Sequence, residues 1–377
     1  MVKLGDICTV VSGSTPSSSV AEYWDGNHIW ITPAELSDDS FIIYDSVRHI
    51  TDRAIQETSL KPFPEGTVIL SSRAPIGKTA IAGCKMYCNQ GFKNLICSDS
   101  IYNKYLYFFL SAKTDYLNSL GRGATFKEIS KYIVENIQIY LPTIEEQKKR
   151  AGILEKLMFL IQTRKKQLSK LNQLVKSRFI EMFGDTKNNI NNFKIYSIGD
   201  ICSLKSGTSL PLNVENEGGD IPYIKVSDMS LPGNERYITI SSRYVTQKTA
   251  GKGIFPVGSV IFPKRGGAIG TNKKRLTQIP ICADLNIMGV IPGANIMPQY
   301  LLSYFDMIDL GKLDNGSSVP QLNNKDIAPL KILLPPLSLQ EQFAAFVEQV
   351  EKAKLSVKQS LDKLETLKKS LMQEYFG

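Results

Sequence analysis

Two long segments of the chain, residues 143–184 and 337–377, carry apolar residues at helical spacing. In the first segment they recur in alternating steps of three and four, and Arg164 and Arg178 fill the two remaining positions. In the second segment only Ser360 interrupts the spacing. A stripe sustained over about four heptads predicts a coiled-coil seam, although two amphipathic helices that each cover their own domain would also fit. The predicted seam residues are Leu154, Leu157, Ile161, Leu168, Leu171, Val175, Phe343, Phe346, Val350, Ala353, Val357, Leu364, Leu367 and Leu371.

The remaining sequence has a different pattern, with short runs of Val, Ile, Tyr and Phe broken by Gly, Pro, Asn and Ser. Such runs predict strands joined by turns, with a few helices between them. Prolines close both of these regions, at Leu141-Pro142 and at Pro335-Pro336. The predicted domains are residues 1–142 and 185–336, followed respectively by a central helix at 143–184 and a C-terminal helix at 337–377.

The chain is one unit of about 190 residues written twice, as its recurring short motifs show. The first copy opens with Gly5-Asp6-Ile7-Cys8 and Ser12-Gly13, which return as Gly199-Asp200-Ile201-Cys202 and Ser206-Gly207. The further matching pairs, in the same order, are Phe63-Pro64-Glu65-Gly66-Thr67-Val68-Ile69 with Phe255-Pro256-Val257-Gly258-Ser259-Val260-Ile261, Arg73 with Arg265, Ile76-Gly77 with Ile269-Gly270, Tyr105-Leu106 with Tyr300-Leu301, Glu146-Gln147 with Glu341-Gln342, and Phe183-Gly184 with Phe376-Gly377.

The length of the repeat predicts a duplicated domain, because solenoid arrays repeat at far shorter periods. The expected fold class is α+β. It consists of two strand-rich, mixed α/β domains in tandem, separated by two long helices that form an antiparallel coiled coil.

The net charge of +9 and the pI near 9.0 favour a polyanionic partner, because basic side chains release counterions from a phosphate backbone. The excess is unevenly distributed. Residues 143–184 carry 10 basic and 4 acidic side chains, and residues 185–336 carry 16 and 12. Local runs such as Lys273-Lys274-Arg275 contribute, although a charge run is usually only a solvated face.

No run of residues is long and apolar enough to span a bilayer, and the N-terminal residues lack an apolar signal core. We therefore expect a cytoplasmic protein. Its six cysteines are expected to be reduced thiols, and Cys84 and Cys88 have no neighbouring pair at zinc spacing, so no metal site is predicted. With only His28 and His49 in the chain, a catalytic histidine is also not expected.

The catalytic motifs that fit part of the sequence all fail. Ile76-Gly77-Lys78-Thr79 is similar to the end of a phosphate-binding loop, but Ser72 stands where the first glycine is required. Pro335-Pro336 lacks the preceding Asn or Asp and the following aromatic residue of a base-flipping methyltransferase. This absence favours recognition over catalysis.

The ordered motifs resemble those of one known family. Two variable domains each end in a Leu-Pro phrase followed by Glu-Gln (residues 141–147 and 335–342) and then by a long helix that closes in Phe-Gly. This arrangement resembles the DNA specificity subunit of type I restriction-modification enzymes over nearly the whole chain. The Gly-Asp-Ile-Cys opening and the Arg and Ile-Gly after the Gly-x-Val-Ile strand also resemble that family's target recognition domains. One departure is expected: the first recognition domain begins at once, without an additional conserved segment before it.

The resemblance implies a subunit without an active site of its own. Such a subunit binds double-stranded DNA with a bipartite target, associates with two methyltransferase subunits, and directs restriction-translocase subunits to the target. S-adenosylmethionine, ATP and magnesium would belong to those partners, and this chain would hold no cofactor. The competing hypotheses are a coiled-coil adaptor without sequence-specific DNA binding and a type II enzyme that has lost its catalytic half.

The resemblance also suggests how the target is measured. A helix of about 36 residues is ~54 Å long, against ~34 to 36 Å for one turn of B-DNA. The paired helices would therefore set an unread spacer between two half-sites. Because the two domains differ in sequence, the half-sites should differ as well.

Residues that contact DNA are expected where the copies differ, in residues 14–61 and 208–252 and in the polar loops 121–127 and 316–321. Arg, Gln, Ser and Thr are the types that read base edges, whereas Lys mostly contacts phosphate. Contact with a partner subunit or with water remains the alternative for each residue. The candidates are Arg73, Lys78, Arg122, Thr125, Lys127, Lys264, Arg265, Lys273, Lys274, Arg275, Ser317, Ser318 and Gln321.

Overall fold

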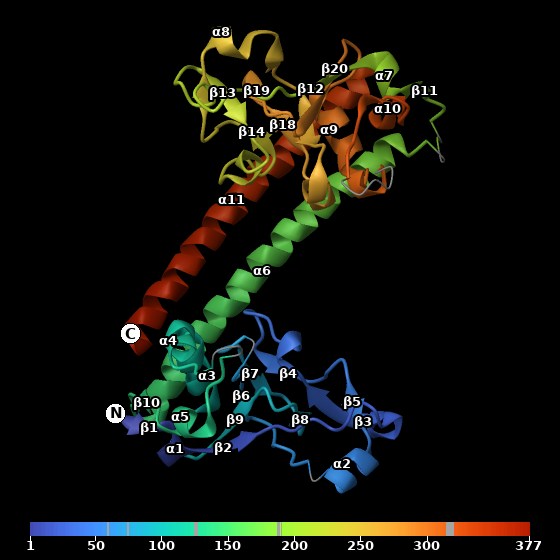
Figure 1. Ribbon diagram of the computed structural model, residues 1–377. Helices are drawn as coiled ribbons and strands as arrows, with labels where there is room; N and C mark the ends of the chain where they lie inside the picture. The colour runs from blue at the N-terminus through green and yellow to red at the C-terminus, as the bar shows by residue number, and fades with distance from the viewer. Residues whose placement is uncertain (59, 74, 124–126, 187–188, 190, 314–319) are drawn as a thin grey trace. The chain divides into compact units, whose positions relative to one another are not determined.

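The computed structural model describes the chain except for residues 59, 74, 124–126, 187–188, 190 and 314–319 (Figure 1). The chain divides into two compact units. Unit 1 comprises Met1–Lys165 together with Gln359–Gly377, and unit 2 comprises Lys166–Lys358. Each unit therefore contains one strand-rich region and half of each of the two 40-residue helices, α6 (Ile144–Phe183) and α11 (Leu337–Phe376).

Unit 1 is built from a five-stranded sheet in the order β2-β9-β6-β7-β4, a three-stranded sheet in the order β5-β3-β8, and the pair β1-β10. Most neighbouring strands are antiparallel, but β4 with β7 and β3 with β8 are parallel. The strands are β1 (Val2–Lys3), β2 (Cys8–Ser12), β3 (Trp24–Ile31), β4 (Ile42–Ile43), β5 (His49–Ile50), β6 (Val68–Leu70), β7 (Thr79–Ala82), β8 (Tyr87–Cys88), β9 (Lys93–Cys97) and β10 (Gln138–Ile139). The shorter helices are α1 (Leu4–Ile7), α2 (Asp52–Thr58), α3 (Asn103–Ala112), α4 (Thr114–Ser119) and α5 (Lys131–Glu135).

Unit 2 repeats this topology. Its five-stranded sheet has the order β12-β20-β17-β18-β14, beside a four-stranded sheet β15-β13-β19-β16 and the pair β11-β21. The strands are β11 (Lys194–Ser197), β12 (Cys202–Ser206), β13 (Ile221–Ile224), β14 (Tyr237–Ile238), β15 (Tyr244–Val245), β16 (Ile254–Phe255), β17 (Val260–Pro263), β18 (Arg275–Thr277), β19 (Ile281–Ala283), β20 (Ile287–Pro292) and β21 (Lys331–Leu334). The shorter helices are α7 (Ile198–Ile201), α8 (Gln247–Ala250), α9 (Pro298–Asp306) and α10 (Asn324–Ile327). The predicted fold class, a tandem duplication of mixed α/β domains, is confirmed.

The sequence shared by the two copies forms the framework. The carboxylate of Asp6 accepts a hydrogen bond from the backbone N–H of Lys3 and so caps α1, and Asp200 caps α7 through Ser197 in the same way. Glycine follows β2 and β12 because a Cβ at Gly13 would lie 1.9 Å from the carbonyl oxygen of Asn89. The repeated Gly-Asp and Ser-Gly motifs are therefore required by local geometry.

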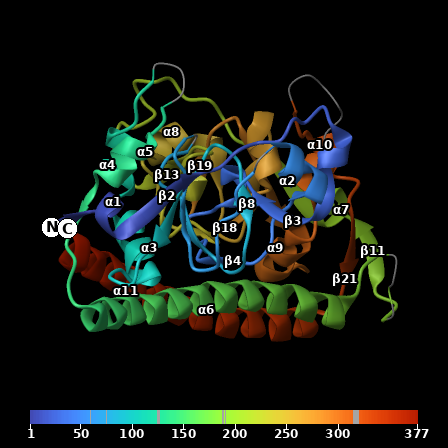
Figure 2. The ribbon, with the colours of Figure 1, turned by 90° about the horizontal axis from the view of Figure 1, so that it is seen from below.

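The core of unit 1 lies between its five-stranded sheet and the long helices. Helix α3 occupies this space, as Figure 2 shows, and six consecutive residues, from Tyr105 to Leu110, are buried. A helix that is apolar on every side must be covered on every side. Residues of α3 pack in one cluster with Val68 of β6, Leu154 of α6 and Phe376 of α11.

The two long helices pack together in antiparallel fashion inside each unit. In unit 1, Leu154 and Leu157 of α6 belong to a core against which Leu364 and Leu371 of α11 pack. In unit 2, Val175 near the end of α6 shares a core with residues near the start of α11, including Phe343 and Val350. The other predicted positions of the α6 stripe are Ile161, which is buried, and Leu168 and Leu171, which are partly buried. The predicted pairing of the helices is confirmed.

Every second position of the α11 seam lies one residue later than the sequence predicted. Val347 is buried, whereas Phe346 is only partly buried, and Leu367 is 48% exposed. Steps of four and then three from Phe343 place Leu361 in the seam instead of Ser360, which removes the apparent break in the stripe. This register places Lys354 and Lys368 at seam positions instead of Ala353 and Leu367, and the long aliphatic stems of lysine allow such burial. Burial lowers the pKa of Lys368.

Candidate nucleic-acid interface

In unit 1, two predicted arginines meet at the end of β6. A loop folds back so that the backbone of Glu128 bridges to both Arg73 and Arg122. Within the described part of the chain, no hydrogen bond or ion pair engages either guanidinium. Lys127, next to Glu128, is exposed, as is Arg122. The structure therefore brings three predicted cationic residues of unit 1 to one edge.

A buried lysine lies beneath this edge. Lys93, the first residue of β9, is buried, and its Nζ lies 3.0 Å from Oε1 of Glu128 and 3.5 Å from Oγ of Ser72. The carboxylate neutralises the ammonium, as a buried charge requires. Sequence reasoning missed this pair, because Lys93 and Glu128 are far apart in the chain and only the strand register brings them together.

Unit 2 has the corresponding edge at the end of β17. The backbone of Arg265 bridges to Gln321, and the backbone N–H of Leu322 donates to the carbonyl of Lys264. The same bond in unit 1 joins Ile129 and Ser72. Arg265 is exposed, and its guanidinium has no internal partner among the described residues. Lys264, Arg265 and Gln321, all predicted from sequence, therefore lie together.

The other basic candidates are held by their own domain. The Nζ of Lys274 donates to Oδ1 of Asn272 and to the carbonyl of Ile308, and burial lowers the pKa of Lys274 to about 8. The Nε of Arg275 donates to the carbonyl of Asn234. These groups already have partners within unit 2, and their contact with DNA stays a prediction. The two remaining basic candidates also have partners. The Nζ of Lys273 donates to Oγ of Ser230, and the Nζ of Lys78 donates to the carbonyl of Leu36.

Three predicted contacts, Thr125, Ser317 and Ser318, lie outside the described residues. The part of the chain that the structure describes holds no cluster of three or more His, Cys, Asp or Glu side chains placed to bind a metal ion. All six cysteines are free thiols. Across the described residues, no helix is both long and apolar enough to cross a membrane.

A buried glutamine ties each long helix to its domain, and sequence reasoning did not identify it. The side chain of Gln147 accepts from the backbone N–H of Tyr102 and donates to the carbonyls of Ser100 and Pro142. Gln340 makes the same three bonds in unit 2, with Met297, Asn295 and Pro335. The sequence comparison that matched Glu146-Gln147 with Glu341-Gln342 was therefore displaced by two residues. Counting from the shared Leu-Pro, at Leu141 and Leu334, would have found the pair.

Replacing this glutamine should destabilise unit 1. We expect Gln147→Leu to lower the free energy of unfolding by about 1–3 kcal/mol, because a buried N–H and two buried carbonyls lose their partner. The matched control is Gln342→Leu on the exposed side of α11, with an expected change within about 0.5 kcal/mol. Denaturant unfolding of both variants measures the difference. Equal effects of the two substitutions would show that the three hydrogen bonds of Gln147 do not stabilise unit 1.

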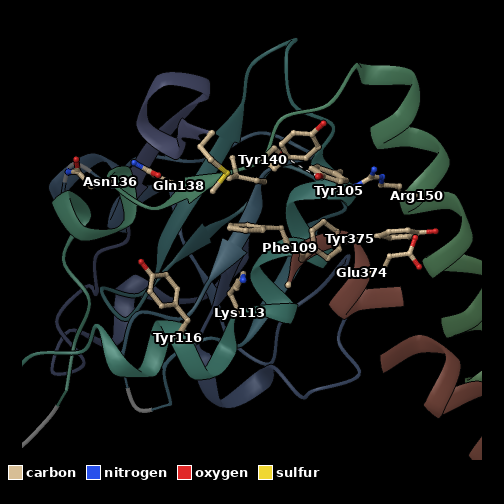
Figure 3. A pocket seen from close by; sticks show the side chains of 14 residues that line it. Tyr105, Phe109, Lys113, Tyr116, Asn136, Gln138, Tyr140, Arg150, Glu374 and Tyr375 are labelled. Carbon is tan, nitrogen blue, oxygen red and sulfur yellow. Dashed lines mark hydrogen bonds between the residues drawn. The ribbon is translucent and has the colours of Figure 1, made fainter. Parts of the chain in front are cut away.

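The phenylalanine of the Phe-Gly motif packs against an equivalent tyrosine in each copy, Tyr105 for Phe376 and Tyr300 for Phe183, but its further neighbours differ. In unit 2, Phe183 packs edge-on against Tyr300 and Phe343 at centroid distances of 4.8 and 5.4 Å. Phe343 comes three residues after Gln340, and the corresponding residue in unit 1 is Arg150. Its Nε donates to Glu146, and its guanidinium lies 5.0 Å from the ring centroid of Tyr375. An open pocket of about 770 Å³ lies here, lined by Arg150, Tyr375 and other residues shown in Figure 3.

Comparisons with known proteins agree on one family. The model of the type I restriction modification DNA specificity domain matches residues 1–173 and again 190–366. The specificity subunit of the type I restriction enzyme MjaIX of Methanocaldococcus jannaschii is 30% identical, over 92% of this chain and 85% of its own. The MjaVIII specificity subunit of the same organism is 24% identical, over 99% and 90%. The solved structure of the type I S subunit from M. genitalium covers 100% of this chain and 95% of its own, with 15% identity and a TM-score of 0.60.

Proposed function

Because the chain belongs to the family of DNA specificity subunits of type I restriction-modification enzymes, we propose that each of its units reads one half of a bipartite, asymmetric DNA target. Unit 1 reads one half-site and unit 2 the other. The subunit acts in the cytoplasm and has no active site of its own. Methyl transfer, translocation and cleavage, with the S-adenosylmethionine, ATP and magnesium that they need, belong to its methyltransferase and restriction partners.

One observation carries this proposal: the two units present the same edge with different side chains. Arg73 and Arg265 occupy equivalent places and have no internal partner among the described residues. Across the backbone bridge, however, unit 1 has Glu128 where unit 2 has Gln321. Groups shared by both edges suit the phosphate backbone, which is the same at every sequence, whereas groups that differ suit base edges. Gln321 can pair with adenine, whereas the carboxylate of Glu128 is already held by Lys93, so the half-sites should differ.

The outer side of α6 supports a docking surface for the methyltransferase partners. In unit 1, Ile153 and Leu160 are exposed seven residues apart, and Phe159 beside them is 68% exposed. In unit 2, Leu174 continues the same heptad position and is also exposed. Apolar side chains repeated on one exposed helix face are typical of a surface that a partner covers.

Exchange of one unit tests the assignment. Residues 186–335 are replaced with the matching segment of a related subunit, and the chimera is expressed with its methyltransferase partner. We expect methylome sequencing to show one new half-site and one unchanged half-site, because each unit has its own core and its own edge. The isolated chain should transfer no methyl group. A change in both half-sites would refute independent reading, and methylation without sequence preference would favour an adaptor.

A further inference from the structure

Each unit has a buried lysine at the same sheet edge, but the strand that supplies the lysine and the partner of its ammonium differ between the units. In unit 1 the lysine is Lys93, the first residue of β9, and Glu128 neutralises it. In unit 2 the strand register places Met288 at the position of Lys93, because Ser12 pairs with Lys93 and Ser206 pairs with Met288. The lysine instead comes from the neighbouring strand end, as Lys264. Both units thus hold a buried ammonium at this edge, supplied from different strands.

Lys264 has no neutralising carboxylate among the residues that the structure describes. Its side chain is only 9% exposed, and its Nζ donates to Oγ of Ser206 at 2.8 Å. Burial and the neighbouring Arg265 lower the pKa of Lys264, and no carboxylate among the described residues forms an ion pair with it. Gln321, which stands where unit 1 has Glu128, is neutral. A buried ammonium with only a hydroxyl partner is unfavourable, and an anion supplied from outside would offset that cost.

The surroundings of Lys264 are open to a large anion. Arg265 follows it, exposed and without an internal partner in the described chain. The next turn, Gly266–Thr271, is rich in glycine, and an added Cβ at Gly266, Gly267 or Gly270 would meet no atom within 4 Å. A glycine turn beside two cations allows a phosphate backbone to approach the protein backbone closely.

We propose that Lys264 and Arg265 together bind one backbone phosphate of the DNA target in unit 2, and that unit 1 has no equivalent of this clamp because Glu128 occupies its lysine. The proposal rests on the proposed function, since it assumes that this edge faces DNA. The clamp positions unit 2 without reading sequence. Unit 2 therefore supplies more of the salt-dependent affinity, and unit 1 depends more on direct contacts with bases.

The test uses the full chain assembled with its methyltransferase partner and measures DNA affinity against salt concentration. We expect Lys264→Met combined with Arg265→Ala to reduce the slope of log K against log salt by about one. Affinity should fall roughly tenfold at ~0.1 M salt, to the same extent for target and non-target DNA. The matched control, Lys93→Met with Glu128→Gln, removes a neutral pair and should leave the slope unchanged. Free inorganic phosphate should compete only weakly, because one clamp holds only one phosphate of many.

Each outcome has a distinct meaning. An unchanged slope in the double variant, or loss of discrimination at a single base pair, would overturn the phosphate clamp. Absence of sequence preference in the unaltered complex would instead overturn the proposed function. If the double variant does not fold, Arg265→Ala alone remains informative, because Arg265 is exposed and its guanidinium has no internal partner among the described residues.

Discussion

Leu154→Asp is expected to unfold unit 1 and to abolish assembly with the methyltransferase partner. Leu154 is fully buried in the cluster that joins α3, the sheet and both long helices. A carboxylate there would have no partner, and the loss of a core leucine alone costs about 2–5 kcal/mol. A buried, unpaired charge adds several kcal/mol more, so the change approaches the whole stability of a typical domain.

The neighbouring residue provides the control. Ile153 lies on the same turn of α6 but is 37% exposed. Ile153→Asp should therefore leave thermal unfolding nearly unchanged while weakening the docking of the methyltransferase subunit. Thermal unfolding of the isolated chain separates the two effects, and co-purification with the partner measures docking. Similar unfolding curves for Leu154→Asp and the unaltered chain would show that the helices do not depend on this packing.

The repeat made most of the fold predictable from sequence. Residues that both copies share, such as Asp6 with Asp200 and Gly13 with Gly207, turned out to be caps and close backbone approaches. Geometry of this kind depends on a few neighbouring residues, so it restricts the residue types at those positions and can be recognised from the sequence. The heptad stripe was also visible, because helix packing has a fixed period.

The errors arose where two readings of one pattern were both plausible. Phe346 and Val347 are adjacent and both apolar, so the spacing alone could not decide which of them faces the partner helix. Ser360 was the one signal in favour of the register that contains Val347, because Leu361 beside Ser360 fits an apolar seam better. The partner helix decides the register, and a single sequence does not show which of its residues lies opposite.

The candidate site was only partly predictable for a related reason. Basic residue type identified Arg265 and Lys274 equally, although the guanidinium of Arg265 has no internal partner among the described residues and Lys274 is held by Asn272 and Ile308. Nor could the sequence reveal that Lys93 and Lys264 serve the same edge, because they come from different strands. The sequence shows which residues are charged, but only the fold shows whether a charged group is already bound by neighbouring groups.

Lengthening both long helices by one heptad is expected to widen the spacer of the target by about three base pairs without changing the bases read. Seven residues add ~10 Å of helix at ~1.5 Å per residue, and base pairs are ~3.4 Å apart. The insertions belong at the boundary between the units, after Lys165 in α6 and after Lys358 in α11. There Lys165 lies 3.9 Å from Glu365 of the opposite helix, so paired insertions keep the antiparallel seam in register.

An insertion in α6 alone is the informative contrast. The added heptad would have no partner on α11, so apolar side chains on one side of the insertion would lose their register. We therefore expect the single insertion to lower the thermal stability and to abolish methylation, whereas the double insertion keeps both. Methylome sequencing of cells that carry each variant reads the outcome. If the double insertion altered the recognised bases while leaving their separation unchanged, the helices would not set the spacer, and the distance between half-sites would have to be fixed by the partner subunits.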